Sequence, residues 1–295
     1  MSRVVGRFAP SPTGRLHLGH AYSCLLAHDQ ARERGGAFLL RIEDIDPGRT
    51  REAFVAGIFE DLAWLELGWD GEVVRQSARL PLYASALEEL KAKGLVYPCF
   101  CTRAAIAAEI AASASAPHGP DGPVYPGTCR HLSSEARSAR ISEPHAWRLD
   151  VARAARAAGP LYWKDGDTEA QAEPEAFGDV VLARKDAPVS YHLAVTIDDA
   201  AQGVTDVVRG RDLYAATDVH RLLQALLGLP TPLYHHHPLL TDPEGRRLAK
   251  RHGAPTLASL RQAGADPAEL VAALRSGQLP EGYSTTIPLS LGERG

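Results

Sequence analysis

Hydrophobic and polar residues in the first third of the chain alternate between the spacing of a β-strand and the spacing of a helix. Short apolar runs at residues 4–9 and 37–42 predict buried strands, because proline or glycine bounds each of them. Hydrophobic residues three and four positions apart predict helices at residues 16–34, 52–67 and 80–94. This order of strand, helix, strand and helix is typical of a parallel α/β sheet.

The α/β pattern is interrupted near residue 98. The segment 98–185 carries three of the four cysteines, a stretch of small residues, and a loop rich in proline and glycine. After it, the hydrophobic pattern predicts a strand at 191–197, a second strand at 204–208 and a helix at 215–227. The sequence therefore predicts one α/β domain that is split by an insertion.

Composition and charge are those of an ordinary globular protein. The chain has 295 residues, of which 45% are hydrophobic and 23% charged, and its formal net charge is −4. This charge argues against a protein that coats nucleic acid, but it permits a local basic face. No apolar run reaches about 18 residues, the N-terminus lacks the features of a signal peptide, and four cysteines are too few for a disulfide framework. We therefore expect a cytoplasmic protein without a membrane partner, with a monomer as the simplest state.

The stretch RFAPSPTGRLHLGH, residues 7–20, places two histidines in the turn between the first strand and the first helix. Such a turn can bind phosphate, because the N-terminus of the helix presents free N–H groups at the carboxyl end of the sheet. His17 and His20 are three residues apart and fall on one face of the first helical turn. Gly19 lacks a side chain, which lets a flat ring or a phosphate approach the backbone. On its own, an HxGH pattern is also compatible with structural or exposed histidines.

Three further segments carry charged groups that suit a nucleotide-binding site. Glu43, Asp44 and Asp46 follow the second strand, where carboxylates can bind an amine, a ribose hydroxyl or a metal. Arg209 lies in DVVRGRD, where a guanidinium can bind a carboxylate or a phosphate through two N–H groups. The segment GRRLAKR, residues 245–251, is strongly basic. Taken singly, the acidic segment also fits a solvated turn and the basic segment an exposed loop.

In this order the four segments resemble the class I aminoacyl-tRNA synthetases, specifically the glutamyl branch. RFAPSPTGRLHLGHA looks like the extended first signature of that branch, RIEDIDPGRT like its next block, DVVRGRDLYAATDVHRLL like a later block, and RRLAKR like its lysine-rich loop. The resemblance covers about residues 3–260. It implies a Rossmann-type parallel-sheet catalytic domain with its first half at 1–97 and its second half at 186–240. A zinc-containing, acceptor-binding-like insertion would occupy 98–185, and the lysine-rich loop and a shortened helical segment would occupy 241–295.

The resemblance also implies roles for individual residues. The family joins the carboxylate of an amino acid to the α-phosphate of ATP, and this carboxylate needs no strong base because it is already ionised at neutral pH. His17, Gly19 and His20 would contact ATP, and Lys250 would neutralise the departing pyrophosphate with the help of Mg²⁺. The two histidines and Lys250 would be the catalytic groups. The glutamate substrate would be bound by Arg7, Ser11, Glu43, Tyr191 and Arg209.

The lysine-rich loop departs from the family pattern at two positions. Arg247 stands where the family has its first lysine, and this change keeps the charge. Ala249 stands where the family has a serine, and this change removes a hydroxyl. The resemblance therefore carries over only Lys250 in this loop.

Three thiols of the insertion have a spacing that suits a structural zinc ion with one further ligand: Cys99, Cys101 and Cys129. From chemistry alone His131 or His118 would complete the site, because imidazole is a commoner zinc ligand than phenol. The order C-x-C followed by Y-x-x-x-C, however, resembles a small synthetase-like subfamily in which a tyrosine completes the site. This resemblance makes Tyr125 the expected fourth ligand, with His131 second. The alternative is three free cysteines without a metal.

Two other features are interpreted as structural. Consecutive residues of an extended segment face opposite ways, so the histidines at 235–237 are not expected to form a metal site. Cys24 lies within a predicted helix and is expected to be buried.

The segment after the lysine-rich loop indicates which branch of the family the chain resembles. Full glutamyl-tRNA synthetases continue into helical anticodon-binding domains, whereas only a short segment follows Arg251 here, and we expect no such domain. Together with the zinc pattern, this resembles the glutamyl-queuosine tRNA(Asp) synthetases, a truncated glutamyl-tRNA synthetase-like family. That resemblance implies ATP-dependent, tRNA-independent activation of L-glutamate and its transfer to queuosine in the anticodon of tRNA(Asp).

Three other functions are compatible with parts of this pattern. One is a conventional glutamyl-tRNA synthetase that uses a separate anticodon-binding partner. A second is a catalytically silent paralogue that binds tRNA, although the retained histidines and charged residues argue against it. A third is a nucleotidyltransferase with the HxGH signature, which the glutamate-type block RIEDID disfavours.

Overall fold

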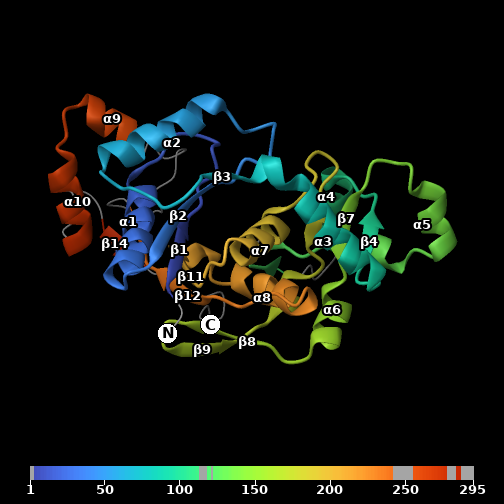
Figure 1. Ribbon diagram of the computed structural model, residues 1–295. Helices are drawn as coiled ribbons and strands as arrows, with labels where there is room; N and C mark the ends of the chain where they lie inside the picture. The colour runs from blue at the N-terminus through green and yellow to red at the C-terminus, as the bar shows by residue number, and fades with distance from the viewer. Residues whose placement is uncertain (1–2, 113–117, 121, 242–254, 278–283, 287–295) are drawn as a thin grey trace.

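The computed structural model of the chain describes residues 3–112, 118–120, 122–241, 255–277 and 284–286. Its first three strands are parallel and lie in the order β1-β2-β3, where β1 is Val5–Phe8, β2 is Ala37–Ile42 and β3 is Val74–Arg75. Strand β11 (Asp206–Gly210) lies beside β1, because the Thr205 N–H donates to the Val5 carbonyl at 2.9 Å. β11 in turn pairs in parallel with β12 (Leu233–His237). The predicted parallel α/β arrangement is thereby confirmed (Figure 1).

Helices connect these strands largely where the hydrophobic spacing predicts them. They are α1 (Leu18–Glu33), α2 (Glu52–Trp64), α3 (Leu80–Ala92), which follows the 3₁₀ turn η1 (Gln76–Arg79), and α8 (Ala216–Leu226), which follows η4 (Arg211–Leu213). Each helix lies within a predicted range and ends up to three residues earlier than expected. Cys24 lies in α1 and is fully buried, as expected.

The segment 191–197 is a helix and not the predicted strand. It belongs to α7 (Tyr191–Ala201), and every residue from 193 to 199 is buried. A helix that is buried on all sides shows no polar face, and this one contains β-branched residues at 195–197. Its sequence therefore has the short apolar run that is typical of a buried strand, and periodicity alone cannot separate the two.

The insertion forms an antiparallel sheet in the order β10-β7-β4, from β4 (Val96–Cys99), β7 (Ala146–Leu149) and β10 (Val181–Ala183). Two further strands, β8 (Tyr162–Asp165) and β9 (Thr168–Gln171), extend the sheet of β11 and β12 instead, because β8 pairs with β12. The insertion also contains α4 (Arg103–Ala112), β5 (His118–Gly119), β6 (Gly122–Pro123), η2 (Thr128–His131), α5 (Ser134–Arg140), α6 (Val151–Ala158) and η3 (Pro174–Phe177). The predicted boundaries between the segments stay a prediction.

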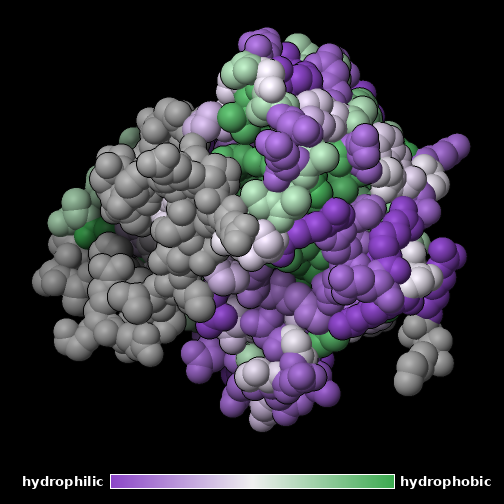
Figure 2. Space-filling view, turned by 90° about the vertical axis from the view of Figure 1, so that its left-hand side faces the viewer, coloured by the Kyte–Doolittle hydropathy of each residue, from purple (hydrophilic) through white to green (hydrophobic). Residues whose placement is uncertain are grey.

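The C-terminal part packs back on the first helix. It contains β13 (Leu239–Thr241), which pairs with β14 (Ser284–Thr286), and the helices α9 (Leu257–Gln262) and α10 (Pro267–Ser276). The Leu257 N–H donates to the Leu16 carbonyl at 2.9 Å, and an antiparallel bridge joins His17 to Thr256. Apolar residues of α9 and α10 share one buried cluster with α1. On the side of the molecule that carries α9 and α10, hydrophilic side chains predominate among the residues drawn in colour, with patches of hydrophobic ones between them (Figure 2).

Candidate active site

A cavity of about 440 Å³ lies where the carboxyl ends of β1 and β11 meet the N-terminus of α1. The order of strands reverses here, and this is where open α/β sheets bind ligands. Eight residues predicted from the sequence line this one cavity: Arg7, Ser11, His17, Gly19, His20, Glu43, Tyr191 and Arg209. The ninth, Lys250, lies outside the described residues.

The two histidines of the HLGH turn form the cap of α1. His17 Nδ1 accepts a hydrogen bond from the Gly19 N–H, and His20 Nδ1 accepts one from the His17 N–H, both at 3.2 Å. In the neutral rings these bonds leave the proton on Nε2, which is then the nitrogen that can donate to a phosphate oxygen. A Cβ on Gly19 would lie 3.1 Å from the His17 ring, so this glycine also leaves room for the imidazole.

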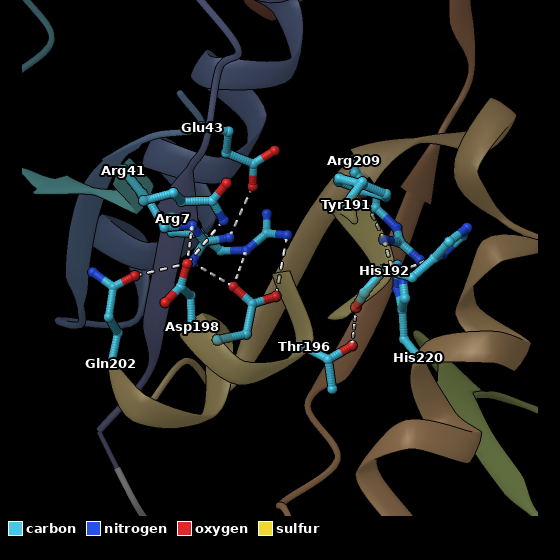
Figure 3. Close-up of polar contacts among 12 residues, drawn as sticks. Arg7, Arg41, Glu43, Tyr191, His192, Thr196, Asp198, Gln202, Arg209 and His220 are labelled. Carbon is cyan, nitrogen blue, oxygen red and sulfur yellow. Dashed lines mark hydrogen bonds and ion pairs between the residues drawn. The ribbon is translucent and has the colours of Figure 1, made fainter. Parts of the chain in front are cut away.

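A buried network of charges holds Arg7 on one side of the cavity (Figure 3). Arg7 donates to both oxygens of Asp199, at 3.1 and 3.4 Å, and Arg41 donates to Asp199 Oδ1 at 2.8 Å. Arg41 also donates to Glu43 Oε1 at 3.2 Å. Burial alone would raise the pKa of Asp199, but the two arginines outweigh it and lower this pKa below its usual value. The charge of Arg7 is therefore compensated by a carboxylate of the protein.

The pKa of Glu43 is shifted in the opposite direction from that of Asp199. Burial has the largest effect and raises the pKa of the Glu43 carboxyl in spite of the nearby Arg41 and Arg7. A cation that entered the cavity beside Glu43 would favour its ionised form. This behaviour suits a carboxylate that pairs with the ammonium group of a substrate.

Arg209 and Tyr191 lie on the opposite side of the cavity from Arg7 (Figure 3). Arg209 Nη1 contacts the Tyr191 hydroxyl at 3.5 Å, and the Arg209 side chain is buried. Sequence reasoning missed the residues that hold these arginines. The adjacent acids Asp198 and Asp199, in an otherwise apolar run, were a signal that could have revealed one of them.

The thiols of Cys99, Cys101 and Cys129 lie within 4.8 Å of one another, and this is the only such cluster among the described residues. The Tyr125 hydroxyl lies 3.5 Å from the sulfurs of both Cys99 and Cys101, and it accepts a hydrogen bond from the Cys129 N–H at 2.9 Å. Three sulfurs and one phenolic oxygen thus converge from the end of β4, from the segment that follows it, from the loop before η2 and from η2. This donor set fits a metal ion that prefers four soft or intermediate ligands.

A second cavity of about 440 Å³ adjoins the first and shares its residues Ser11, Thr13, Glu43 and Tyr191. Its other wall comes from the insertion and includes Tyr125 and Arg148, whose guanidinium lies 4.0 Å from the Tyr125 ring. Arg49, from the loop after β2, and Arg184 also line this cavity, and each pairs with a carboxylate: Arg49 with Asp46 at 2.8 Å and Arg184 with Asp186 at 2.6 Å. The second cavity therefore lies between predicted substrate-binding residues and Tyr125, whose hydroxyl contacts the cysteine cluster.

A further cavity of about 780 Å³ lies elsewhere, between α1, β12 and α10. It contains none of the predicted catalytic or substrate-binding residues. The histidines at 235–237 reach it, but they bind different partners: Asp206, Asp165 and Ser23 in turn. The interpretation of these histidines as structural agrees with this arrangement. Among the described helices, none is long and apolar enough to cross a membrane.

Comparison with known proteins matches residues 3–285 to the family model of the catalytic domain of class I tRNA synthetases (E and Q). A protein of Rhodobacter capsulatus named glutamyl-Q tRNA(Asp) synthetase is 52% identical over 90% of this chain and 98% of its own length. Proteins with the same name from Symbiobacterium thermophilum and Deinococcus radiodurans are 46% and 47% identical. They match 91% and 92% of this chain, and 84% and 88% of their own lengths.

Solved structures show the same resemblance. A glutamate tRNA ligase of Elizabethkingia meningosepticum, in complex with its amino acid, superposes with a TM-score of 0.76 at 27% identity over 92% of this chain. The glutamate-tRNA synthetase of Elizabethkingia anophelis superposes with a TM-score of 0.77, also at 27% identity. The chain spans about 60% of the length of these two structures.

Proposed function

Because the chain belongs to the class I tRNA synthetases of the glutamate and glutamine type, and among them to the glutamyl-Q tRNA(Asp) synthetases, we propose that it activates L-glutamate with ATP in the absence of tRNA. It then transfers the glutamyl group to queuosine in the anticodon of tRNA(Asp). The family membership makes the protein a ligase.

The observation that carries this proposal is the composition of the first cavity. Its lining includes Arg7, Arg209 and Glu43, which suit an amino acid with a side-chain carboxylate. It also includes the two histidines of the HLGH turn. Both substrates of an activation step can therefore be bound next to each other, and positioning of this kind supplies much of the rate enhancement.

Activation joins an oxygen of the α-carboxylate of glutamate to the α-phosphorus of ATP. The bond from that phosphorus to the oxygen that bridges to the β-phosphate breaks, and pyrophosphate leaves with its electron pair. His17 and His20 donate from Nε2 to phosphate oxygens as negative charge develops on them. Arg7 and Ser11 orient the substrate, Glu43 binds its ammonium group, and Tyr191 and Arg209 close the pocket.

Lys250 and Mg²⁺ complete this step in the proposal. ATP enters as its Mg²⁺ complex, which offsets part of the charge of the triphosphate. Lys250 supplies a further positive charge for the departing pyrophosphate. Gly19 belongs to the same part of the site, next to His17.

We further propose that one structural Zn²⁺ per chain is bound by Cys99, Cys101, Cys129 and Tyr125. The convergence of the three sulfurs and the Tyr125 hydroxyl supports this ligand set. The other candidate, His131, is exposed at the end of η2. A closed set of four protein ligands leaves no position for substrate, so this ion is structural and contributes to folding.

The second cavity suits the acceptor nucleoside of the transfer step. Arg148, which has no carboxylate partner among the described residues, can bind an RNA phosphate, and the cavity adjoins the proposed glutamate site at Ser11, Thr13, Glu43 and Tyr191. A nucleoside bound there reaches the activated carbonyl carbon, forms the new bond to it, and displaces AMP.

Glutamate-dependent exchange of pyrophosphate into ATP tests the activation step. We expect exchange with purified protein and L-glutamate without any RNA, and none with D-glutamate. Exchange that appears only after tRNA is added would contradict tRNA-independent activation. No exchange under either condition would favour the catalytically silent paralogue.

Labelled glutamate offered to tRNA(Asp) with and without queuosine tests the transfer step. We expect label only on the queuosine-containing tRNA, and we expect it to stay after the 3′-terminal nucleotides have been removed. Label on the 3′ end of tRNA(Glu) would instead favour a conventional glutamyl-tRNA synthetase that works with a separate anticodon-binding partner.

A further inference from the structure

The two arginines of the proposed glutamate pocket have different kinds of partner. Arg7 is paired with the carboxylate of Asp199, so its charge is largely compensated within the protein. Arg209 contacts only neutral groups among the described residues, and none of its contacts there is a carboxylate. An uncompensated buried guanidinium is costly unless a ligand supplies the counter-charge.

Four side chains hold Arg209 in place. Its Nε donates to His236 Nε2 at 3.1 Å, its Nη1 to His220 Nδ1 at 3.2 Å, and its Nη2 to Thr217 Oγ1 at 2.6 Å. The Tyr191 hydroxyl contacts Nη1 at the longer distance of 3.5 Å. A guanidinium has five N–H groups, so these contacts leave one Nη2 N–H for a ligand in the cavity.

The hydrogen bonds of the two histidines define their protonation states. His236 Nδ1 donates to Asp165 Oδ1 at 3.1 Å, which leaves the lone pair of Nε2 to accept from Arg209. His220 Nδ1 accepts from Arg209, so its proton lies on Nε2, which faces His192 Nδ1 at 3.2 Å. If the accepting nitrogen of either histidine were protonated, that imidazole would become a cation and its N–H would point at the Arg209 guanidinium.

Burial and the nearby Arg209 favour the same neutral forms. Burial is the main cause that lowers the pKa of His236 to about 4, and hydrogen bonding to Asp165 opposes this only in part. Burial, followed by the charge of Arg209, lowers the pKa of His220 well below its usual value. Both rings are therefore neutral acceptors at physiological pH.

Glutamate and glutamine differ only in the charge and the hydrogen-bonding groups at the end of the side chain. The α-carboxylate loses its charge when the adenylate forms, whereas the side-chain carboxylate keeps its charge throughout. A fixed cation without a counter-charge therefore suits the side-chain carboxylate, because it stabilises that group equally before and after activation.

We propose that three neutral side chains, those of His220, His236 and Thr217, position Arg209 without compensating its charge, so that this charge can pair with a substrate carboxylate. This neutral group of side chains would set the preference for glutamate over glutamine. The proposal rests on the proposed function. His220, His236 and Thr217 act through Arg209 and are positioning residues, and Asp165 belongs to the same group because it fixes the tautomer of His236.

Replacement of Thr217 tests the role of charge with a matched pair of variants. Thr217→Asp places a carboxylate beside Arg209, and Thr217→Asn places a neutral amide of the same size as that carboxylate there. With exchange as the assay, we expect Thr217→Asp to lower kcat/KM for glutamate about 100-fold more than Thr217→Asn does, because a protein carboxylate then competes for the guanidinium. The kcat/KM ratio of glutamate to glutamine should fall by a similar factor in Thr217→Asp only.

Replacement of His236 tests the direction of its hydrogen bonds, and it stays informative if the Thr217→Asp variant does not fold. In His236→Gln the side-chain oxygen can occupy the place of Nε2 and accept from Arg209. In His236→Asn the amide can occupy the place of Nδ1 and donate to Asp165, but the acceptor for Arg209 is lost. We expect the KM for glutamate to be about 10-fold higher in His236→Asn than in His236→Gln, with the KM for ATP equal in both.

The outcomes separate this inference from the proposed function. If the wild-type protein shows no glutamate-dependent exchange, the proposed function fails. The wild type can instead be active while the two variants of each folded pair have the same kcat/KM ratio of glutamate to glutamine and the same KM for glutamate. In that case the proposed positioning role of His220, His236 and Thr217 is wrong, and the proposed function stands. Melting temperatures identify variants that fail to fold, and only folded variants are compared.

Discussion

Glu43 is a buried carboxylate that lies between a protein cation and the proposed position of a substrate cation. Burial raises the pKa of its carboxyl, while Arg41 and Arg7 partly offset this shift. Binding of an ammonium group would complete the compensation of its charge. The side chain is therefore suited to distinguish a substrate that carries an amine from one that does not.

Glu43→Gln keeps the size of the side chain and removes its charge. We expect the KM for glutamate in the exchange reaction to rise about 10- to 100-fold, because the ammonium group loses a buried partner. The KM for ATP should change little. Glu52→Gln is the matched control, because Glu52 is exposed and pairs with Arg75 at the surface. Equal effects on glutamate and on ATP would indicate a general disturbance of the site.

At the level of single residues, the sequence was informative where a side chain faces the cavity directly. Arg7, His17, His20 and Glu43 stand in uninterrupted signatures, and the structure brings them together. The residues that hold the arginines could not be found in this way. Asp199 and His236 act through another side chain over long separations in sequence, and no local spacing marks such contacts.

At the level of elements, the prediction is best where the less buried positions of a segment recur at helical spacing. α1 and α8 combine buried and less buried positions at helical spacing, and both were predicted to within two residues at each end. α7 is buried along most of its length, and its apolar run was interpreted as a strand. The same burial allows α7 to supply Asp199 to the first half of the sheet, where it contacts Arg7 and Arg41.

The metal site joins β4 to the 3₁₀ turn η2, and its loss should affect this part of the insertion first. We expect one equivalent of zinc in the purified protein and much less in Cys129→Ser, with a lower melting temperature for that variant. Exchange with glutamate and ATP should fall less than transfer to tRNA, because Tyr125 lines the second cavity and not the first.

Cys24→Ser provides the control for this prediction. Cys24 is a buried thiol of α1 outside the cluster, so its replacement should leave the zinc content at one equivalent. Protein that contains no zinc after purification without chelators would refute the metal site. An unchanged zinc content in Cys129→Ser would exclude Cys129 as a ligand.

At the scale of the whole molecule, the insertion contributes to the proposed glutamate site indirectly, through His236 and Arg209. β8 pairs with β12, and its last residue, Asp165, contacts His236 through both the backbone N–H and the imidazole. The sequence-based prediction placed these two strands in separate domains, because the residues of a short strand do not indicate which other strand it pairs with. The pairing depends on tertiary contacts between distant parts of the chain.

The buried histidines predict a loss of stability in mild acid. The pKa of His236 is about 4 in the folded protein and about 6.5 in an unfolded chain, so the unfolded state binds more protons between these values. The free energy of unfolding therefore falls as the pH decreases from 6.5 to 4, by on the order of 3 kcal/mol for this group. His220 acts in the same direction.

Melting temperatures measured between pH 7.5 and 4.5 test this expectation. His236→Gln removes the ionisable group, so its melting temperature should fall less steeply with decreasing pH than that of the wild type. Parallel curves for the two proteins would show that His236 does not carry the effect. Carboxylates that titrate in the same range contribute to both curves, and the difference between the curves isolates the histidine.

The docking of α9 on the HLGH turn has a consequence for the order of events during protein synthesis. His17 is made well before Thr256 and Leu257, which pair with this turn and follow it by more than 200 residues in the sequence. A growing chain therefore contains the HLGH turn long before this turn acquires its last backbone partners. The proposed nucleotide site should therefore be complete only once Leu257 has been made, and a fragment that ends before Thr256 should bind ATP poorly although it contains both histidines.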